Sequence, residues 1–210
     1  MTAPKPMSLR KQLSDITLEQ AERAIYIDFE GFKEKAPHLI GVLIDDTYQS
    51  IVLDPDLALA ASAKQLPVMG LKDAMESLLR QSIQEDRYIV GFSYHEKKTV
   101  LEYAGIDISQ RYRDAHKVAK TWANRLPGDK PESWRLVTFL KFIGFEYTNY
   151  GQSLVTKWLR AVIGKSNKEG SLDACSPTVK GHWTNLLLYN EQDCRGTKAL
   201  MLHALRDGKR

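Results

Sequence analysis

The chain has 210 residues, 43% of them hydrophobic, which is enough to bury the core of one large domain. Its formal net charge of +4 is compatible with a polyanionic partner but too small to establish one. The two cysteines, Cys175 and Cys194, exclude a disulfide framework, and no segment has the apolar run of a signal peptide or a membrane span. We therefore expect a cytoplasmic protein with no membrane partner.

The hydrophobic pattern predicts an α/β fold. Residues 1–22 are a polar leader that includes the pattern of a short helix, and a single domain is expected at 23–210. Alternating or continuous apolar residues predict strands at 23–32, 38–45, 49–53 and 88–93.

Helical patterns follow the third strand and dominate the second half of the chain. Segments with helical spacing are 71–83, 96–104, 133–143 and 152–163. The glycines that follow the last three, Gly105, Gly144 and Gly164, are expected to end them. A helical insertion is thus predicted at about 109–180, within which the polar residues 165–178 indicate a flexible loop or lid.

Two carboxylates end the first predicted strand. In the segment 25–30 (Ile-Tyr-Ile-Asp-Phe-Glu), Asp28 and Glu30 are two positions apart, so a strand points both to the same face, about 6–7 Å apart. Like charges this close repel unless a cation lies between them, and hard oxygen ligands suit Mg²⁺ or Mn²⁺. The alternative is that Asp28 and Glu30 cap a solvated strand end.

A leucine-rich helix near the other end carries a carboxylate on an apolar face. Tyr189, Asp193 and Thr197 lie on one stripe with Leu186 and Leu200, by steps of three and four residues. A carboxylate in such a stripe is unfavourable unless it is paired or bound to a metal. The alternative is a structural Asp193 that is hydrogen-bonded to Thr197 or ion-paired with Arg195 or Lys198.

Together, the Asp-x-Glu strand and the Tyr-x-x-x-Asp helix resemble the DEDD superfamily of 3′–5′ exonucleases. Tyr189 places the chain nearer the tyrosine-bearing, RNase D-like (DEDDy) branch. The segment 189–195 (Tyr-Asn-Glu-Gln-Asp-Cys-Arg) is most similar to predicted RNase H-like nucleases of the YprB type, which often occur beside RecB-like nuclease modules. The resemblance covers about residues 23–205. It implies an RNase H-like fold, with a mixed central sheet whose first three strands are antiparallel, flanking helices and a helical insertion before the last motif.

The superfamily also needs an acidic residue from a middle motif, for which two residues compete. The resemblance places this motif at 92–96 (Phe-Ser-Tyr-His-Glu), where Ser93 replaces the usual Asn and the turn has no Asp. Glu96 is the first candidate, although a carboxylate in the first turn of a helix is also explained by capping and the helix dipole. Asp114 is the second, in a segment that would form a fifth strand; its alternative is a solvated surface position.

The resemblance implies phosphodiester hydrolysis by two Mg²⁺ or Mn²⁺ ions about 3.5–4 Å apart, which activate a water and stabilise the departing 3′-oxygen. Asp28 would bridge the ions, Glu30 and Asp193 would complete one site, and Glu96 would help to fix the other. Tyr189 would orient the attacking water, because an unperturbed tyrosine is a poor base at neutral pH.

The expected partner is nucleic acid, DNA or RNA, bound as a single-stranded 3′ end. Candidates for contacts with it are His95, Arg195 and Lys198. A nucleic-acid-binding module that no longer cuts, and a structure-specific endonuclease on the same fold, stay open as alternatives.

Four tryptophans lie within or near basic stretches, where aromatic rings can stack on bases: Trp122, Trp134, Trp158 and Trp183. Core packing is expected for at least two of them.

Overall fold

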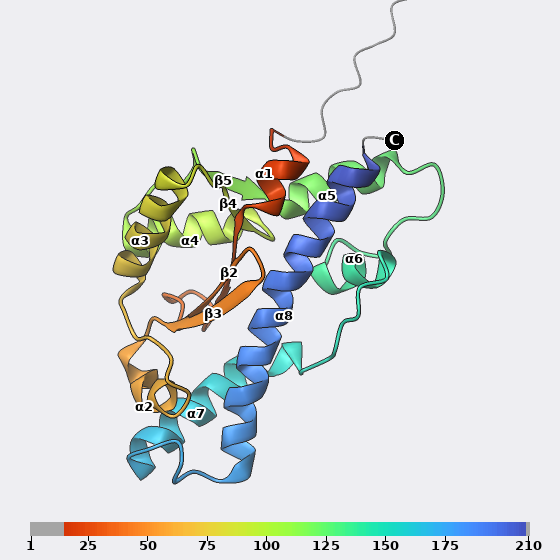
Figure 1. Ribbon diagram of the computed structural model, residues 1–210. Helices are drawn as coiled ribbons and strands as arrows, with labels where there is room; N and C mark the ends of the chain where they lie inside the picture. Colours follow the sequence, from red (N-terminus) through yellow and green to blue (C-terminus); the bar gives the residue numbers. More distant parts are fainter. Residues whose placement is uncertain (1–14, 209–210) are drawn as a thin grey trace, which may run out of the picture.

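The computed structural model describes residues 15–208, whose five strands form one mixed sheet in the order β3-β2-β1-β4-β5 (Figure 1). The strands are β1 (Ile25–Glu30), β2 (Leu39–Ile44), β3 (Thr47–Val52), β4 (Ile89–Gly91) and β5 (Tyr112–Asp114). The first three are antiparallel neighbours, whereas β4 pairs parallel with both β1 and β5. The predicted α/β class and the antiparallel start of the sheet are therefore confirmed.

Helices cover both faces of this sheet. They are α1 (Leu18–Glu22), α2 (Ala58–Ser62), α3 (Leu71–Gln84), α4 (Tyr94–Ala104), α5 (Ala115–Arg125), α6 (Leu136–Phe142), α7 (Val155–Glu169) and α8 (Pro177–Asp207), with short 3-10 turns at Pro55–Leu57 and Gln152–Leu154. One core lies between the sheet and α3 and α4, and two others lie on the α8 side. None of the helices in the described part of the chain is both long and apolar enough to cross a membrane.

The side chains of β1 divide between the two faces by the period of two that a strand imposes. Ile25 and Ile27 belong to the core with α3 and α4, whereas Tyr26 belongs to a core with α5, α6 and α8. Asp28 and Glu30 share the parity of Tyr26 and so face α8. This helix is 31 residues long and runs beside the strands from the bottom to the top of Figure 1, where it is drawn in blue.

The expected loop at 165–178 is wrong in its first part, because α7 continues through Gly164 to Glu169. The helix ends only at Gly170, whose φ of 74° is in the left-handed region. Ser166, fully buried against the core, donates a hydrogen bond to the Val162 carbonyl at 2.7 Å. Packing of this last turn outweighs the weak helix propensity of one exposed glycine.

The segment before β1 contributes to the core. Ile16 and Ala21 are 2% and 0% exposed and belong to the core that includes α8. Thr17 and Gln20 form a capping box that begins α1. The expected leader is therefore part of the packed domain from about Ile16, and residues 1–14 lie outside the described part.

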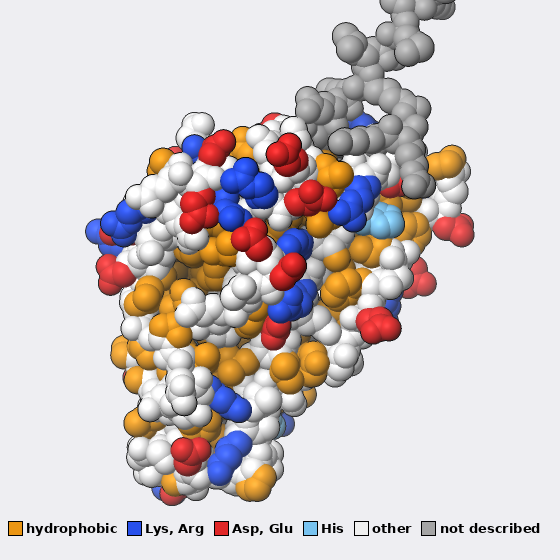
Figure 2. Space-filling view, in the orientation of Figure 1, with side chains coloured by type: hydrophobic (Ala, Val, Ile, Leu, Met, Phe, Trp, Pro, Cys, Tyr) orange, Lys and Arg blue, Asp and Glu red, His pale blue; other side chains and the backbone are white. Residues whose placement is uncertain are grey.

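Charges of both signs are mixed on the face that carries α8. Figure 2 shows Lys, Arg, Asp and Glu side chains side by side over its upper half, where Figure 1 has α1 and the end of α8. Ion pairs on the described surface include Arg87–Asp45 at 2.8 Å and Arg206–Glu22 at 2.9 Å. The positive net charge is thus not gathered into one patch on this face.

Candidate metal centre

Three carboxylates meet where α8 crosses β1. Asp28, Glu30 and Asp193 each have an oxygen within 4.8 Å of those of the other two. Glu30 and Asp193 are 8% and 6% exposed, and Asp28 is half-buried. The structure therefore brings together the two carboxylate motifs that lie near opposite ends of the sequence.

This cluster concentrates negative charge without a compensating cation. Within residues 15–208, no Lys, Arg or His forms an ion pair with any of the three carboxylates. Burial and the Asp193 charge raise the pKa of Glu30 to about 8, and burial raises the pKa of Asp193 to about 6. The pKa of Asp28 is also raised well above its usual range, by burial and by its acidic neighbours. Hard oxygen donors in this number and spacing fit Mg²⁺ or Mn²⁺.

Asn190 holds Asp28 in place. Its Nδ2 donates to Asp28 Oδ2 at 2.7 Å and to the Asp28 carbonyl at 3.1 Å, and its Oδ1 accepts from the Tyr48 hydroxyl at 2.7 Å. Gly41 on β2 is the residue opposite Asp28 on β1. It leaves room for the Asn190 side chain, because a Cβ at position 41 would lie 2.1 Å from Asn190 Oδ1. Asn190 was not among the predicted site residues, although its position three residues before Asp193 indicates the same helix face.

Two tyrosines lie beside Asp193. The Tyr147 hydroxyl donates to Asp193 Oδ1 at 3.2 Å, and Tyr189, one turn earlier on α8, is near enough to oppose the rise in the pKa of Asp193. Burial and the nearby carboxylates raise the pKa of both phenols, so both stay protonated at neutral pH. Tyr189 and Asp193 thus lie on one buried face of α8, as predicted.

Tyr147 could not be found from sequence, since it lies in an irregular segment between α6 and α7. Gln192 ties this segment to α8. Its Oε1 accepts from the Thr148 backbone N–H at 2.7 Å, and its Nε2 donates to the Thr148 carbonyl at 2.9 Å. The residue beside Asp193 therefore places the tyrosine that binds Asp193.

Glu96 combines a cap with a position at the site. Its Oε2 accepts from the Ser93 backbone N–H at 3.1 Å, which completes a capping box with Ser93 at the start of α4. The same oxygen accepts from the Ser93 hydroxyl at 3.2 Å and from the Tyr112 hydroxyl at 3.1 Å. Glu96 also lines a cavity together with Asp28 and Asp193, and its charge helps to raise the pKa of Asp28. The capping role of Glu96 is therefore confirmed, and its place in the cavity leaves its role as a metal ligand a prediction, because the three carboxylates whose oxygens converge are Asp28, Glu30 and Asp193.

Asp114 has a different place. It ends β5, the fifth strand expected there, and its Oδ1 accepts from the Lys117 backbone N–H at 3.0 Å as the N-cap of α5. It does not line the cavity that Asp28, Glu96 and Asp193 share. The structure therefore does not bring Asp114 to the carboxylate cluster.

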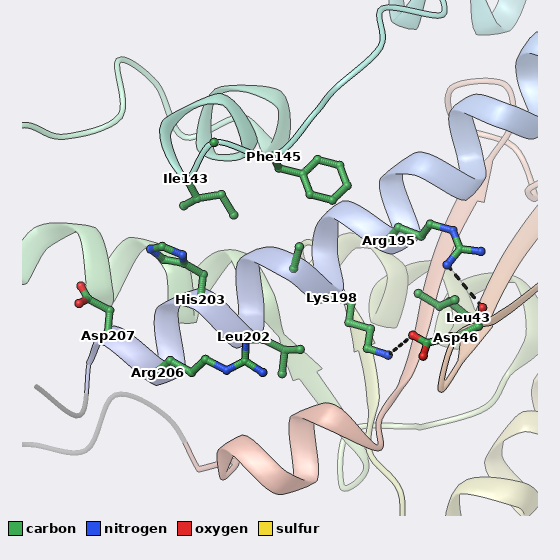
Figure 3. A pocket seen from close by; sticks show the side chains of 12 residues that line it. Leu43, Asp46, Ile143, Phe145, Arg195, Lys198, Leu202, His203, Arg206 and Asp207 are labelled. Atoms are coloured by element: carbon green, nitrogen blue, oxygen red, sulfur yellow. Dashed lines mark hydrogen bonds and ion pairs between the residues drawn. The ribbon is translucent and has the colours of Figure 1, made fainter.

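The three residues expected to contact substrate lie in two separate places. His95 is exposed and lines the cavity of Asp28 and Asp193. Arg195 and Lys198 line a different cavity of about 660 Å³, beside residues 143–145, where Figure 3 shows both reaching towards Asp46. At about 100° per residue, positions 195 and 198 fall on another side of α8 from position 193.

Arg195 and Lys198 also have partners of their own. Arg195 forms an ion pair with Glu191 at 2.7 Å, and Lys198 pairs with Asp46 at 3.2 Å and donates to the Asp45 carbonyl. Neither is an ion-pair partner of Asp193, so the ion-paired alternative for Asp193 does not hold.

Comparisons of the chain with protein-family models, with curated proteins and with solved structures found no match.

Proposed function

We propose that this protein is a metal-dependent 3′–5′ exonuclease that hydrolyses phosphodiester bonds of DNA or RNA. The observation that carries the proposal is the buried cluster of Asp28, Glu30 and Asp193, which has no compensating cation among the described residues. Three antiparallel strands followed by two parallel ones, and a largely helical region before α8, support an RNase H-like fold and the resemblance to the DEDD superfamily.

The residues of the site divide into metal ligands and groups that position them. Asp28, Glu30 and Asp193 would hold Mg²⁺ or Mn²⁺, with Glu96 beside them. When bound, such ions supply an activated water and stabilise charge on the leaving oxygen. Asn190 orients Asp28 through its two hydrogen bonds.

Tyr189 and Tyr147 act as protonated phenols. Because their pKa values are raised, they can donate hydrogen bonds at neutral pH but cannot accept a proton from water. Tyr189 would orient the attacking water while it holds Asp193, and Tyr147 would support the same carboxylate from the segment between α6 and α7.

A nucleic-acid-binding module without activity is the second candidate. The observation in its favour is that Glu96 Oε2 already accepts three hydrogen bonds as part of the cap of α4. In such a module Glu96 would serve only as the cap, and the middle motif would contribute no acidic ligand to the site.

An end-labelled single strand, incubated with the protein and Mn²⁺, tests the proposal. Stepwise shortening from the 3′ end supports it, binding without shortening supports the inactive module, and internal cuts indicate an endonuclease. A parallel reaction with EDTA and one with an Asp28→Asn preparation control for contaminating nucleases.

The two candidates for the middle motif give opposite expectations. Glu96→Gln should abolish turnover but keep the fold, because glutamine retains an oxygen that can accept from Ser93. Asp114→Asn should leave turnover close to wild type, because asparagine is an equally good N-cap. Rates on the end-labelled strand and melting temperatures of both variants check this. Loss of turnover in Asp114→Asn with an active Glu96→Gln would move the site to β5.

Tyr189→Phe keeps the ring but deletes the hydroxyl. We expect a rate loss of about 10²-fold, at the lower end of what a positioned proton-transfer group contributes, with little change in Mn²⁺ affinity. Tyr147→Phe is the matched comparison, because it also deletes one hydrogen bond to Asp193. A larger loss for Tyr189→Phe indicates a role towards water; equal losses would mean that both tyrosines only position Asp193.

A further inference from the structure

We propose that Trp134 and Arg135 hold one unpaired nucleotide next to the carboxylate cluster, with Trp134 stacked on its base and Arg135 bound to its phosphate. This inference rests on the proposed function and names the form of the substrate, a single-stranded end. Neither residue belongs to the motifs that the resemblance covers, since both precede α6 in the helical region between β5 and α8.

The two residues share a cavity with the carboxylates. The cavity has a volume of about 410 Å³, and its lining includes Asp28, Glu96 and Asp193 as well as Trp134 and Arg135. This volume lies near the lower end of the range of roughly 300–1,000 Å³ for ligand pockets. It suits one nucleotide unit rather than a base pair.

Trp134 differs from the other three tryptophans. Trp122, Trp158 and Trp183 are 2%, 4% and 0% exposed, which confirms the expected core packing, whereas Trp134 is 38% exposed. The fully buried Phe139 packs against the Trp134 ring, with the centroids 5.7 Å apart, and fixes its position. A supported aromatic ring exposed in a cavity is a platform on which any base can stack.

Cations lie next to this ring. The Arg135 side chain is exposed and, within residues 15–208, forms no ion pair, although three carboxylates line the same cavity. The ammonium group of Lys120 lies 5.4 Å from the Trp134 ring centroid. A free guanidinium is suited to bidentate binding of phosphate, and aromatic rings interleaved with cations are typical of surfaces that bind single strands.

This arrangement predicts that the site selects nucleic acid by the presence of unpaired bases and not by base sequence. Stacking on Trp134 requires an unpaired base and tolerates all four bases. An oligonucleotide with a free single-stranded end should therefore bind more tightly than a duplex with paired ends, and base composition should matter little.

Binding of a ten-residue oligothymidylate in Ca²⁺ tests the inference, with the oligonucleotide checked for cleavage afterwards. Trp134→Ala should weaken binding about tenfold or more, and Trp134→Phe should restore most of it, because phenylalanine still stacks. Arg135→Ala should weaken binding, and it should lower by about one the magnitude of the slope of the logarithm of the binding constant against the logarithm of the salt concentration. The matched controls are Phe142→Ala, at a ring that is 37% exposed, and Arg80→Ala, at an exposed cation on α3.

Intrinsic fluorescence gives a second readout. Because the other tryptophans are buried, quenching on addition of the oligonucleotide should come from Trp134 and should disappear in Trp134→Phe, even if Trp134→Ala fails to fold. Wild-type affinity in Trp134→Ala, quenching that persists in Trp134→Phe, or equal affinity for a blunt duplex would each overturn the inference.

The same data separate this inference from the proposed function. Trp134-dependent binding without hydrolysis in Mn²⁺ supports the nucleotide site and rejects the exonuclease. Hydrolysis with a KM that is unchanged in Trp134→Ala rejects the nucleotide site and leaves the exonuclease standing.

Discussion

Asp28→Asn is expected to abolish turnover and to remove tight Mn²⁺ binding while the fold stays intact. The charges of Glu30, Asp193 and Glu96 all raise the pKa of Asp28. Asp28 therefore lies at the centre of the negative charge. Asparagine is close in shape and still offers Asn190 an oxygen acceptor. Without metal, the loss of like-charge repulsion should leave the free energy of unfolding unchanged or raised.

Three measurements check this result: the end-labelled strand assay, calorimetric titration with Mn²⁺, and thermal unfolding in EDTA. Asp114→Asn is the control, because it removes one negative charge from the neighbouring part of the sheet but not from the cluster. A wild-type rate in Asp28→Asn would show that Asp28 is not a metal ligand.

Without divalent cations, the melting temperature is expected to fall as the pH rises from about 4.5 to 8. The pKa of Glu30 is raised from 4.5 to about 8 and that of Asp193 from 3.8 to about 6. Between these limits the folded state binds more protons than the unfolded state, so stability decreases with pH. One pKa unit corresponds to about 1.4 kcal/mol, and a chain of this size loses about 2–4 °C per kcal/mol. We therefore expect a fall of roughly 5 °C or more.

Bound metal should reverse this dependence, because it competes with protons for the same oxygens. Mn²⁺ should raise the melting temperature more at pH 8 than at pH 5, and Glu30→Gln should flatten the fall seen in EDTA. Thermal scans across pH, with EDTA and with Mn²⁺, decide the question. Equal effects of Mn²⁺ at both pH values would contradict a cluster that loses protons when it binds metal.

The middle of the chain was only partly predictable. The segment that begins α4 was correctly expected to carry Glu96 in its first turn, and a strand at Asp114 was correctly considered. Whether Glu96 or Asp114 lies beside the carboxylate cluster depends on how β4 and β5 align in the sheet. No local sequence pattern contains that alignment. The extent of α7 past Gly164 also depended on packing, since a lone glycine lowers helix propensity by only about 1 kcal/mol.

The sequence by itself determined the direction in which the main side chains point. A period of two places Asp28 and Glu30 on one face of β1, and steps of three and four residues place Tyr189 and Asp193 on one face of α8. These are properties of a single strand or helix, so they follow from local geometry alone.

Only the tertiary structure decided which of these faces meet and what else joins them. It brought α8 across β1, placed Asn190 over Gly41, added Tyr147 from an irregular segment and turned Arg195 and Lys198 away to Asp46. The physical reason is that periodicity fixes the orientation of a side chain within its own element. Contacts between distant elements depend on the packing of the whole core, which no short stretch of sequence encodes.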